Sequence, residues 1–286
     1  MGYMTKYGTI WGLVPHVVGS VYCVAATDQY QLEGRTYGAS DNNDGLSPER
    51  AKRTVNAAMT ACTASVNDMV VLLPGAHSVS TTVTVNKAGL TIVGISGALP
   101  TVDHRGPAGS KRLKSSITST ETAGIIFTVS AVDCEISFIN FSPPAAGGRG
   151  ISLAPLSGAA NRTYIHDCTF SMIATASTTT FGITVPAGVT ADLLEDVLVS
   201  RCYFVSGTGA STGANGPGVN ILGTAHGLTI EQSTFQLKGT AAWAAAILSS
   251  QAGTLGTLIR DCDFQNPTSA TTVITTAYLA TGQTVD

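Results

Sequence analysis

Charged side chains are scarce in this sequence, and their scarcity excludes partners that are gathered by an electric field. Asp, Glu, Lys and Arg make up 12% of the 286 residues, about half the usual share, and the formal net charge is -3. Such a chain has no field that attracts nucleic acid or an anionic membrane surface. The most apolar stretch, residues 7–24, is interrupted by Gly12, Pro15, His16 and Gly19 and is too short to span a membrane. We therefore expect neither nucleic acid binding nor membrane insertion.

Aromatic rings and paired cysteines are also in short supply. Aromatic residues are 6% of the chain, with tryptophan only at Trp11 and Trp243, which leaves few rings on which a sugar could stack. None of the six cysteines forms a Cys-x-x-Cys pair, so neither a zinc site nor a redox centre is predicted. Instead, Cys168, Cys202 and Cys262 recur at one repeat position, where we expect a buried ladder of small side chains. Neighbouring coils would bring Cys168 and Cys202 near disulfide distance.

The chain does contain a repeat, which closes each time on a phenylalanine. Residues 164–170 (YIHDCTF) return as 198–204 (LVSRCYF), 229–235 (TIEQSTF) and 258–264 (LIRDCDF), and a shorter copy ends at Phe141. The closing phenylalanines follow one another at spacings of 29, 34, 31 and 29 residues. Self-similarity at such a period is the signature of a stacked repeat architecture. Each copy is typical of a short strand that bends at a corner.

A second apolar strand is predicted between successive copies of the repeat. These segments begin at Ile125, Gly150, Phe181, Gly218 and Ala245, and they are rich in Val, Ile, Thr and Gly. That composition excludes helical repeats, and the Leu-x-x-Leu-x-Leu ladder of leucine-rich repeats is missing. One period cannot bury its own apolar side, but stacked periods form a continuous core. The sequence therefore predicts an all-β solenoid with at least two strands in each coil.

The region before the repeat predicts a cap. Residues 38–47 form a polar turn, after which Ser47 as N-cap and Pro48 as first residue predict a helix over residues 48–62. Its apolar face is Ala51, Val55, Ala58, Met59 and Cys62.

These features carry a resemblance to a known family. The run DNNDGLSP at residues 41–48, the short helix, the strand and turn of residues 68–75 and the strand of residues 89–94 look like the N-terminal cap and first coils of pectate-lyase-like proteins. The resemblance covers residues 37–264 and implies a single-stranded, right-handed parallel β-helix with a short N-terminal capping helix. With its apolar head, the chain is also similar to β-helical structural proteins of tailed bacteriophages, which serve as spikes, fibres or capsid decorations. That likeness implies a virion location, a homotrimer and contacts with other virion proteins, and it leaves host surface glycans open as partners.

Catalytic residues are hard to find in this framework. Glycoside hydrolysis needs two carboxylates about 5–10 Å apart, and the candidates are Asp167, Glu231 and Asp261, with His226 as a partial echo of a polygalacturonase motif. When the copies are superposed, Asp167 aligns with Arg201, Gln232 and Asp261, so no two adjacent coils carry acids there. His166 and Asp167 are sequence neighbours, and along an extended strand their side chains would point to opposite faces. We therefore predict a non-enzymatic protein, with a carbohydrate-active lyase or hydrolase as the alternative.

Two further expectations concern a metal and assembly. Asp41, Asn43 and Asp44 supply oxygen atoms at the short spacing of a calcium loop, although an Asx-rich turn explains them equally well. Residues 1–36 are interpreted as an attachment or oligomerisation segment that carries Trp11, Val14, Val17 and Tyr22, and residues 37–286 as the β-helix. If the chain were instead cleaved after residues 23–26 (CVAA), which resemble a signal peptidase site, a secreted adhesin would be the third functional class.

Overall fold

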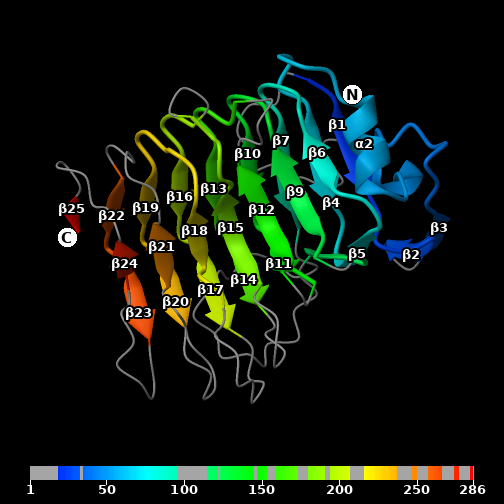
Figure 1. Cartoon of the computed structure of the whole chain (residues 1–286). Coiled ribbons are helices and arrows are strands. Elements are labelled where there is room, and N and C mark those ends of the chain that lie inside the picture. The colour runs from blue at the N-terminus through cyan, green and yellow to red at the C-terminus, as the bar shows by residue number, and fades with distance from the viewer. Residues whose placement is uncertain are drawn as a thin grey trace.

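Three parallel sheets run side by side along the computed structural model, and the chain visits them in turn (Figure 1). The structure describes residues 19–32, 35–95, 115–121, 123–144, 147–153, 159–172, 180–190, 194–206, 216–236, 246–249, 257–265, 274–276 and 284–285. Each strand inside a sheet pairs in register with the strand of the coil before it and of the coil after it, as Ile165 does with Ile136 and Val199. The predicted parallel β-helix is confirmed, with three strands in each coil rather than the minimum of two.

The first sheet has nine strands, which are β1 (Val21–Val24), β4 (Met69–Leu72), β7 (Thr91–Gly94), β10 (Glu135–Ser137), β13 (Tyr164–His166), β16 (Leu198–Ser200), β19 (Thr229–Glu231), β22 (Leu258–Arg260) and β25 (Thr284–Val285). The second sheet has seven strands, which are β5 (Gly75–Val79), β8 (Ser115–Ser119), β11 (Asn140–Ser142), β14 (Thr169–Met172), β17 (Tyr203–Ser206), β20 (Thr234–Gln236) and β23 (Asp263–Gln265). The third sheet also has seven, which are β6 (Val83–Val85), β9 (Ile125–Val129), β12 (Arg149–Leu153), β15 (Phe181–Val185), β18 (Val219–Ile221), β21 (Ile247–Ser249) and β24 (Ile274–Thr276). Each copy of the sequence repeat therefore holds one strand of the first sheet and one of the second.

A ladder of phenylalanines fills the interior beneath the second sheet. Phe141, Phe170, Phe204, Phe235 and Phe264 stack face to face with ring centroids 4.6–5.1 Å apart. The spacing matches the roughly 4.8 Å between parallel strands, so each ring lies directly over its copy in the next coil. The repeat thus fixes both the register of the sheets and the packing of the core.

The cysteine position of the repeat lies inside the same core. Ile139, Cys168, Cys202 and Ser233 are buried at this position, and Cys262 is half-buried in a later coil. All six cysteines are free thiols, and burial raises the pKa of Cys134 to about 11. The predicted ladder of small buried side chains is confirmed.

The cap differs from the predicted helix over residues 48–62. A 3-10 turn, η1 (Pro48–Arg50), is separated from the helix α2 (Val55–Ala61), and Thr54 rather than Ser47 caps α2 by accepting a hydrogen bond from the N–H of Ala57 at 3.2 Å. The break arises because Asp41 Oδ1 accepts hydrogen bonds from the N–H groups of Arg53 and Thr54, which holds this stretch in an extended form. Val55, Ala58 and Met59 still face the core, as predicted.

The first sheet extends into the segment that was predicted to precede the β-helix. β1 pairs in parallel with β4 over four residues, and Cys23 and Val24 are buried. An antiparallel hairpin of β2 (Gln29–Leu32) and β3 (Arg35–Gly38) follows. The β-helix therefore includes residues before 37, and cleavage after residue 26 would remove its first strand.

Candidate functional site

The candidate site lies on the outer face of the first sheet, where alternation along β13 places its polar side chains. Ile165 points into the core and is fully buried, so Tyr164 and His166 point outward. His166 is nevertheless only 8% exposed, because neighbouring side chains enclose its ring. Tyr164 stacks on it with centroids 4.1 Å apart, and Phe138 contacts it edge-on at 5.8 Å.

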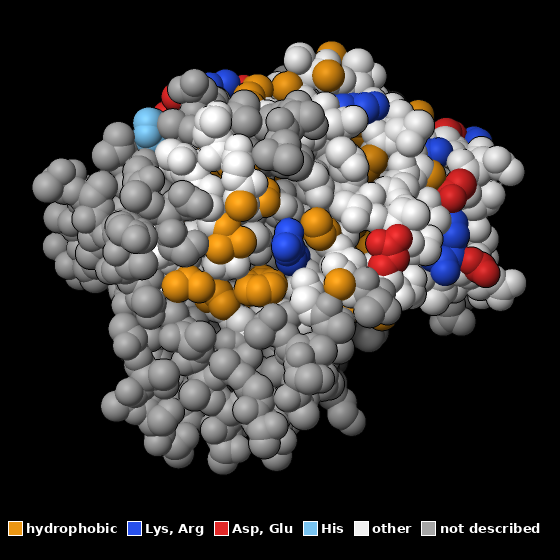
Figure 2. All heavy atoms as spheres, viewed as in Figure 1, with side chains coloured by type: hydrophobic (Ala, Val, Ile, Leu, Met, Phe, Trp, Pro, Cys, Tyr) orange, Lys and Arg blue, Asp and Glu red, His pale blue; other side chains and the backbone are white. Residues whose placement is uncertain are grey.

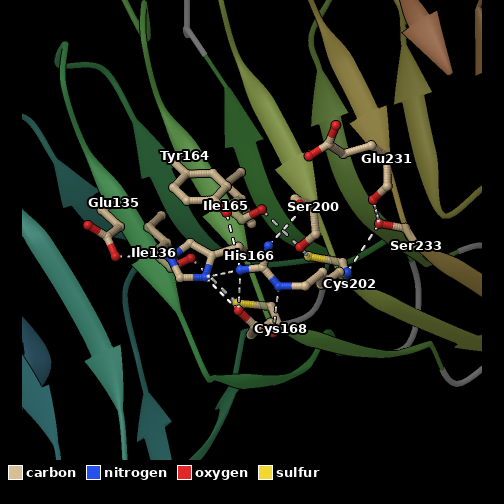
Figure 3. Close-up of polar contacts among 12 residues, drawn as sticks. Glu135, Ile136, Tyr164, Ile165, His166, Cys168, Ser200, Cys202, Glu231 and Ser233 are labelled. Atoms are coloured by element: carbon tan, nitrogen blue, oxygen red, sulfur yellow. Dashed lines mark hydrogen bonds and ion pairs between the residues drawn. The ribbon is translucent and has the colours of Figure 1, made fainter. Parts of the chain in front are cut away.

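Both ring nitrogens of His166 contact carboxylates. Nε2 lies 2.9 Å from Glu135 Oε1 on the preceding coil, and Nδ1 lies 2.7 Å from Oδ2 of Asp167. Figure 3 shows the imidazole between Glu135 and the neighbouring strand, beside the Tyr164 ring. With both nitrogens engaged, neither is free to accept a proton from a substrate.

Arg201 completes the cluster from the next coil. Its Nε and Nη2 donate to the two oxygens of Asp167 at 3.2 and 2.7 Å, and Nη2 also donates to the Tyr164 hydroxyl at 3.2 Å. Nη1 donates to Ser200 Oγ at 3.2 Å. The cluster of Glu135, Tyr164, His166, Asp167 and Arg201 therefore links three consecutive coils, and it is called the His166 cluster below.

The contacts within the His166 cluster favour its charged forms. Burial opposes the charge on His166, but the hydrogen bonds to Asp167 and Glu135 outweigh burial and raise the pKa of the imidazole. Burial likewise opposes the charge on Asp167, yet hydrogen bonds from His166 and Arg201 lower the pKa of its carboxyl to about 2. Asp167 is thus held as a carboxylate and cannot serve as a general acid near neutral pH.

The expectation that His166 and Asp167 point to opposite faces is wrong. β13 ends at His166, and Asp167 adopts a left-handed conformation with φ of 52°. The turn swings the carboxylate back beside the imidazole, whereas the strand rule holds only for extended backbone. Glu135, Tyr164 and Arg201 were not predicted as site residues, although the repeat spacing places Glu135 and Arg201 on the coils before and after His166, and Tyr164 lies on the same strand.

The other catalytic candidates are not brought together with Asp167. Glu231 Oε2 accepts from Arg260 Nε at 2.9 Å, on the adjacent coil. Asp261 occupies the same corner position as Asp167 but three coils away, which is about 14 Å at the interstrand spacing. His226 precedes β19, at the other end of the strands from the Asp167 corner, where it forms an isolated bridge with Glu195. Within the described residues, the carboxylate that the His166 cluster brings near Asp167 is that of Glu135, and the His166 ring lies between the two.

The oxygen atoms of the calcium candidates are engaged by the protein itself. Asp41 accepts from the N–H groups of Arg53 and Thr54, just before α2, and Asp44 accepts from the N–H of Leu46 at 3.0 Å and pairs with Arg50 at 3.1 Å. The ammonium of Lys52 donates to the carbonyl oxygens of Asp41 and Asn43 at 3.2 and 2.7 Å. The loop thus has the hydrogen bonds of an Asx-rich turn with a lysine at its centre.

Across the described residues, no group of three metal-ligating side chains forms, and no helix is long and apolar enough to cross a membrane.

The assembly candidates are only partly covered by the structure. Trp11, Val14 and Val17 lie outside the described residues. Tyr22, on β1, is half-buried and packs against the main core.

Several solved structures resemble this chain at low sequence identity. No family model matches the sequence, and no curated protein matches it. A structure titled Geobacillus virus E2 ORF18 covers 84% of this chain at 12% identity with a TM-score of 0.36, and this chain spans 53% of its length. The pectin methylesterase of Aspergillus niger covers 82% of this chain at 14% identity with a TM-score of 0.39, and this chain spans 89% of it. A rhamnogalacturonan lyase covers 93% of this chain at 12% identity with a TM-score of 0.32, and this chain spans 62% of its length.

The three parallel sheets, with strand pairing conserved from coil to coil, decide the architecture. The chain is a parallel β-helix. This is the architecture that the resemblance to pectate-lyase-like proteins implied. Because the identities are at most 14% and the TM-scores are below 0.5, neither a family nor a function follows from these likenesses.

Proposed function

We propose that this parallel β-helix is a non-enzymatic structural protein of a bacteriophage virion, a capsid decoration, fibre or spike that acts through rigid shape and subunit contacts. The observation that carries the proposal is the state of the acidic side chains on the first sheet. Asp167 is held by His166 and Arg201, and Glu231 is held by Arg260. A hydrolase would keep such carboxylates free to exchange protons, whereas here Asp167 and Glu231 form ion pairs with arginines of the next coil.

The distribution of charge also supports a role in packing. Figure 2 shows most of the charged side chains of one face toward the N-terminal end, around β2 and β3, with one basic side chain near the middle and others along the upper edge. Over the third sheet, the described side chains are mostly uncharged (Figure 2). Faces with so little charge lose little solvation energy when subunits associate, and closed symmetry is the usual way to cover them. A homotrimer that binds other virion proteins through residues near the N-terminus fits this pattern.

The rival function is a carbohydrate-active enzyme, and a depolymerisation assay separates the two. Purified protein is incubated with surface polysaccharide extracted from the host bacterium and, in parallel, with pectin. New reducing ends and the ultraviolet absorbance of unsaturated uronates are then measured. We expect no product above that of heat-denatured protein.

A matched variant makes this assay decisive. Product formation that is lost in the double variant Asp167→Asn, Glu231→Gln would overturn the proposal and identify the first sheet as the catalytic face. Binding of polysaccharide without cleavage would agree with a fibre or spike that contacts host glycans.

A further inference from the structure

Both ring nitrogens of His166 have carboxylate partners, which a histidine that only fills space in the core would not need. It lies between carboxylates on both sides, in a cluster that crosses three coils. Glu135 comes from the coil of β10, His166 and Asp167 from the coil of β13, and Arg201 from the coil of β16. The proton count on this one ring therefore affects contacts along the axis of the solenoid.

The geometry is that of a doubly protonated ring. When both nitrogens carry protons, each donates to a carboxylate, at 2.9 Å to Glu135 and 2.7 Å to Asp167. The Tyr164 ring stacked at 4.1 Å also favours a cation over a neutral ring. A neutral imidazole has one N–H, so one carboxylate would face a nitrogen lone pair instead of a donor.

The surroundings also provide for the neutral state. Arg201 Nη2 lies 3.3 Å from Nδ1 of His166 and already donates to Asp167. When Nδ1 loses its proton, Nη2 can turn the N–H that donates to the Tyr164 hydroxyl toward the nitrogen lone pair, while Nε2–H stays on Glu135. The ring then keeps one hydrogen bond to a carboxylate in place of two, and the donor of that bond no longer carries a positive charge.

We propose that His166 is a pH-dependent latch on the outer face of the first sheet, closed across three coils when the ring is protonated and loosened when it is neutral. This inference goes beyond the proposed structural function, because it makes the stiffness of the solenoid depend on pH. It does not depend on where in a particle the protein sits.

The sign of the effect follows from the directions of the two pKa shifts. The pKa of His166 is raised in the folded protein, so its contribution is complete below about pH 6.5, the value of a free histidine, and is lost as the pH rises through the folded pKa. The pKa of Asp167 is lowered to about 2, so its contribution is complete above about pH 3.9 and is lost as the pH falls through the folded pKa. The cluster is therefore strongest in mild acid.

The charged groups that face His166 are all accounted for within the described residues. Glu135 faces it from β10, Asp167 from the corner that follows β13, and Arg201 from the corner that follows β16. The Tyr164 side chain on β13 also contacts the ring. One cation beside two carboxylates leaves the neutral ring with a net negative neighbourhood, which favours protonation.

The first test is a proton titration of the intact protein by NMR, with histidine labelled at Cε1 and the His166 signal assigned by its loss in His166→Gln. We expect its midpoint to lie above about 6.5. His77 is an internal contrast, because burial lowers the pKa of this ring, whose Nε2 contacts the carbonyl oxygen of Leu73 at 2.8 Å. Glu135→Gln should shift the His166 midpoint downward while the other histidine signals stay in place.

The second test compares thermal unfolding at about pH 5 and about pH 8. The wild-type protein should gain more stability on acidification than His166→Gln does, since the variant has no proton to bind at this position. His226→Gln is the matched control and should respond as the wild type does. A His166 midpoint at or below that of a free histidine, or an unchanged pH response in His166→Gln, would overturn the latch.

Discussion

At the corner that ends each middle strand of the first sheet, one residue turns the chain with a positive φ. Asp167, Arg201, Gln232 and Asp261 hold this position with φ of 48–52° in four successive coils. A left-handed conformation costs most L-residues about 1–2 kcal/mol, and Asp tolerates it better than Gln because its short side chain can bond locally. Neighbouring side chains of an extended strand point to opposite faces, but the left-handed corner brings the Asp167 side chain beside His166.

Gln232 offers the clearest test of this corner. It is exposed, and its N–H donates to the carbonyl oxygen of Arg260 at 3.2 Å, a bond that glycine would keep. We expect Gln232→Gly to increase the free energy of unfolding by about 0.5–1 kcal/mol, because relief of strain exceeds the entropy cost of glycine. Thr234→Gly, two residues later on β20, should decrease it by a similar amount. Urea unfolding of both variants measures the difference, and a loss of stability in Gln232→Gly would contradict the account of the corner.

The sequence could predict which residues align between coils, but it could not predict the backbone conformation at the corner. The alignment of Asp167 with Arg201, Gln232 and Asp261 was correct, because the period alone determines it. The relation of His166 to Asp167 was not, because residue types alone do not reveal a left-handed turn at an aspartate. Glu135 and Arg201 could have been found by pairing each residue of β13 with its repeat partners.

At the scale of the element, the stacked rings and the small residues that face them form one unit. Gly182 on β15 packs against Phe204, and a Cβ there would lie 2.9 Å from the ring and 2.5 Å from the carbonyl oxygen of Gly218. The glycines within the third-sheet strands are therefore required by close packing.

The apolar pattern of the sequence predicted these strands. The predicted start of the helix was wrong, because the contacts that hold residues 53–54 extended come from Asp41, in the turn before the helix.

The ladder should respond to truncation according to position. Phe204→Ala removes a fully buried ring that stacks on rings from two neighbouring coils, and we expect a loss of about 3–5 kcal/mol in the free energy of unfolding. Phe264→Ala should cost less, because its ring is half-buried. Chemical denaturation of both variants, followed by circular dichroism, checks the order. Equal losses would show that the ladder does not act as a continuous core.

At the scale of the whole molecule, the coil stack and the segment before it overlap. β1 pairs with β4, so a truncation that leaves the β-helix intact must stop before Val21 rather than at residue 36. Residues 21–24 do not share the repeat, and only the register with β4 shows that they continue the first sheet. The attachment role predicted for the apolar residues before β1 stays a prediction, as does the trimer.

The measurement that tests the central claim most directly is quantitative mass spectrometry of gradient-purified phage particles, with isotope-labelled peptides of this chain as standards. A virion structural protein should be present in every preparation at a constant copy number relative to the major capsid protein, and a trimer requires that number to be a multiple of three. Loss of the chain from washed particles, with its recovery in the soluble fraction of the lysate, would contradict the claim.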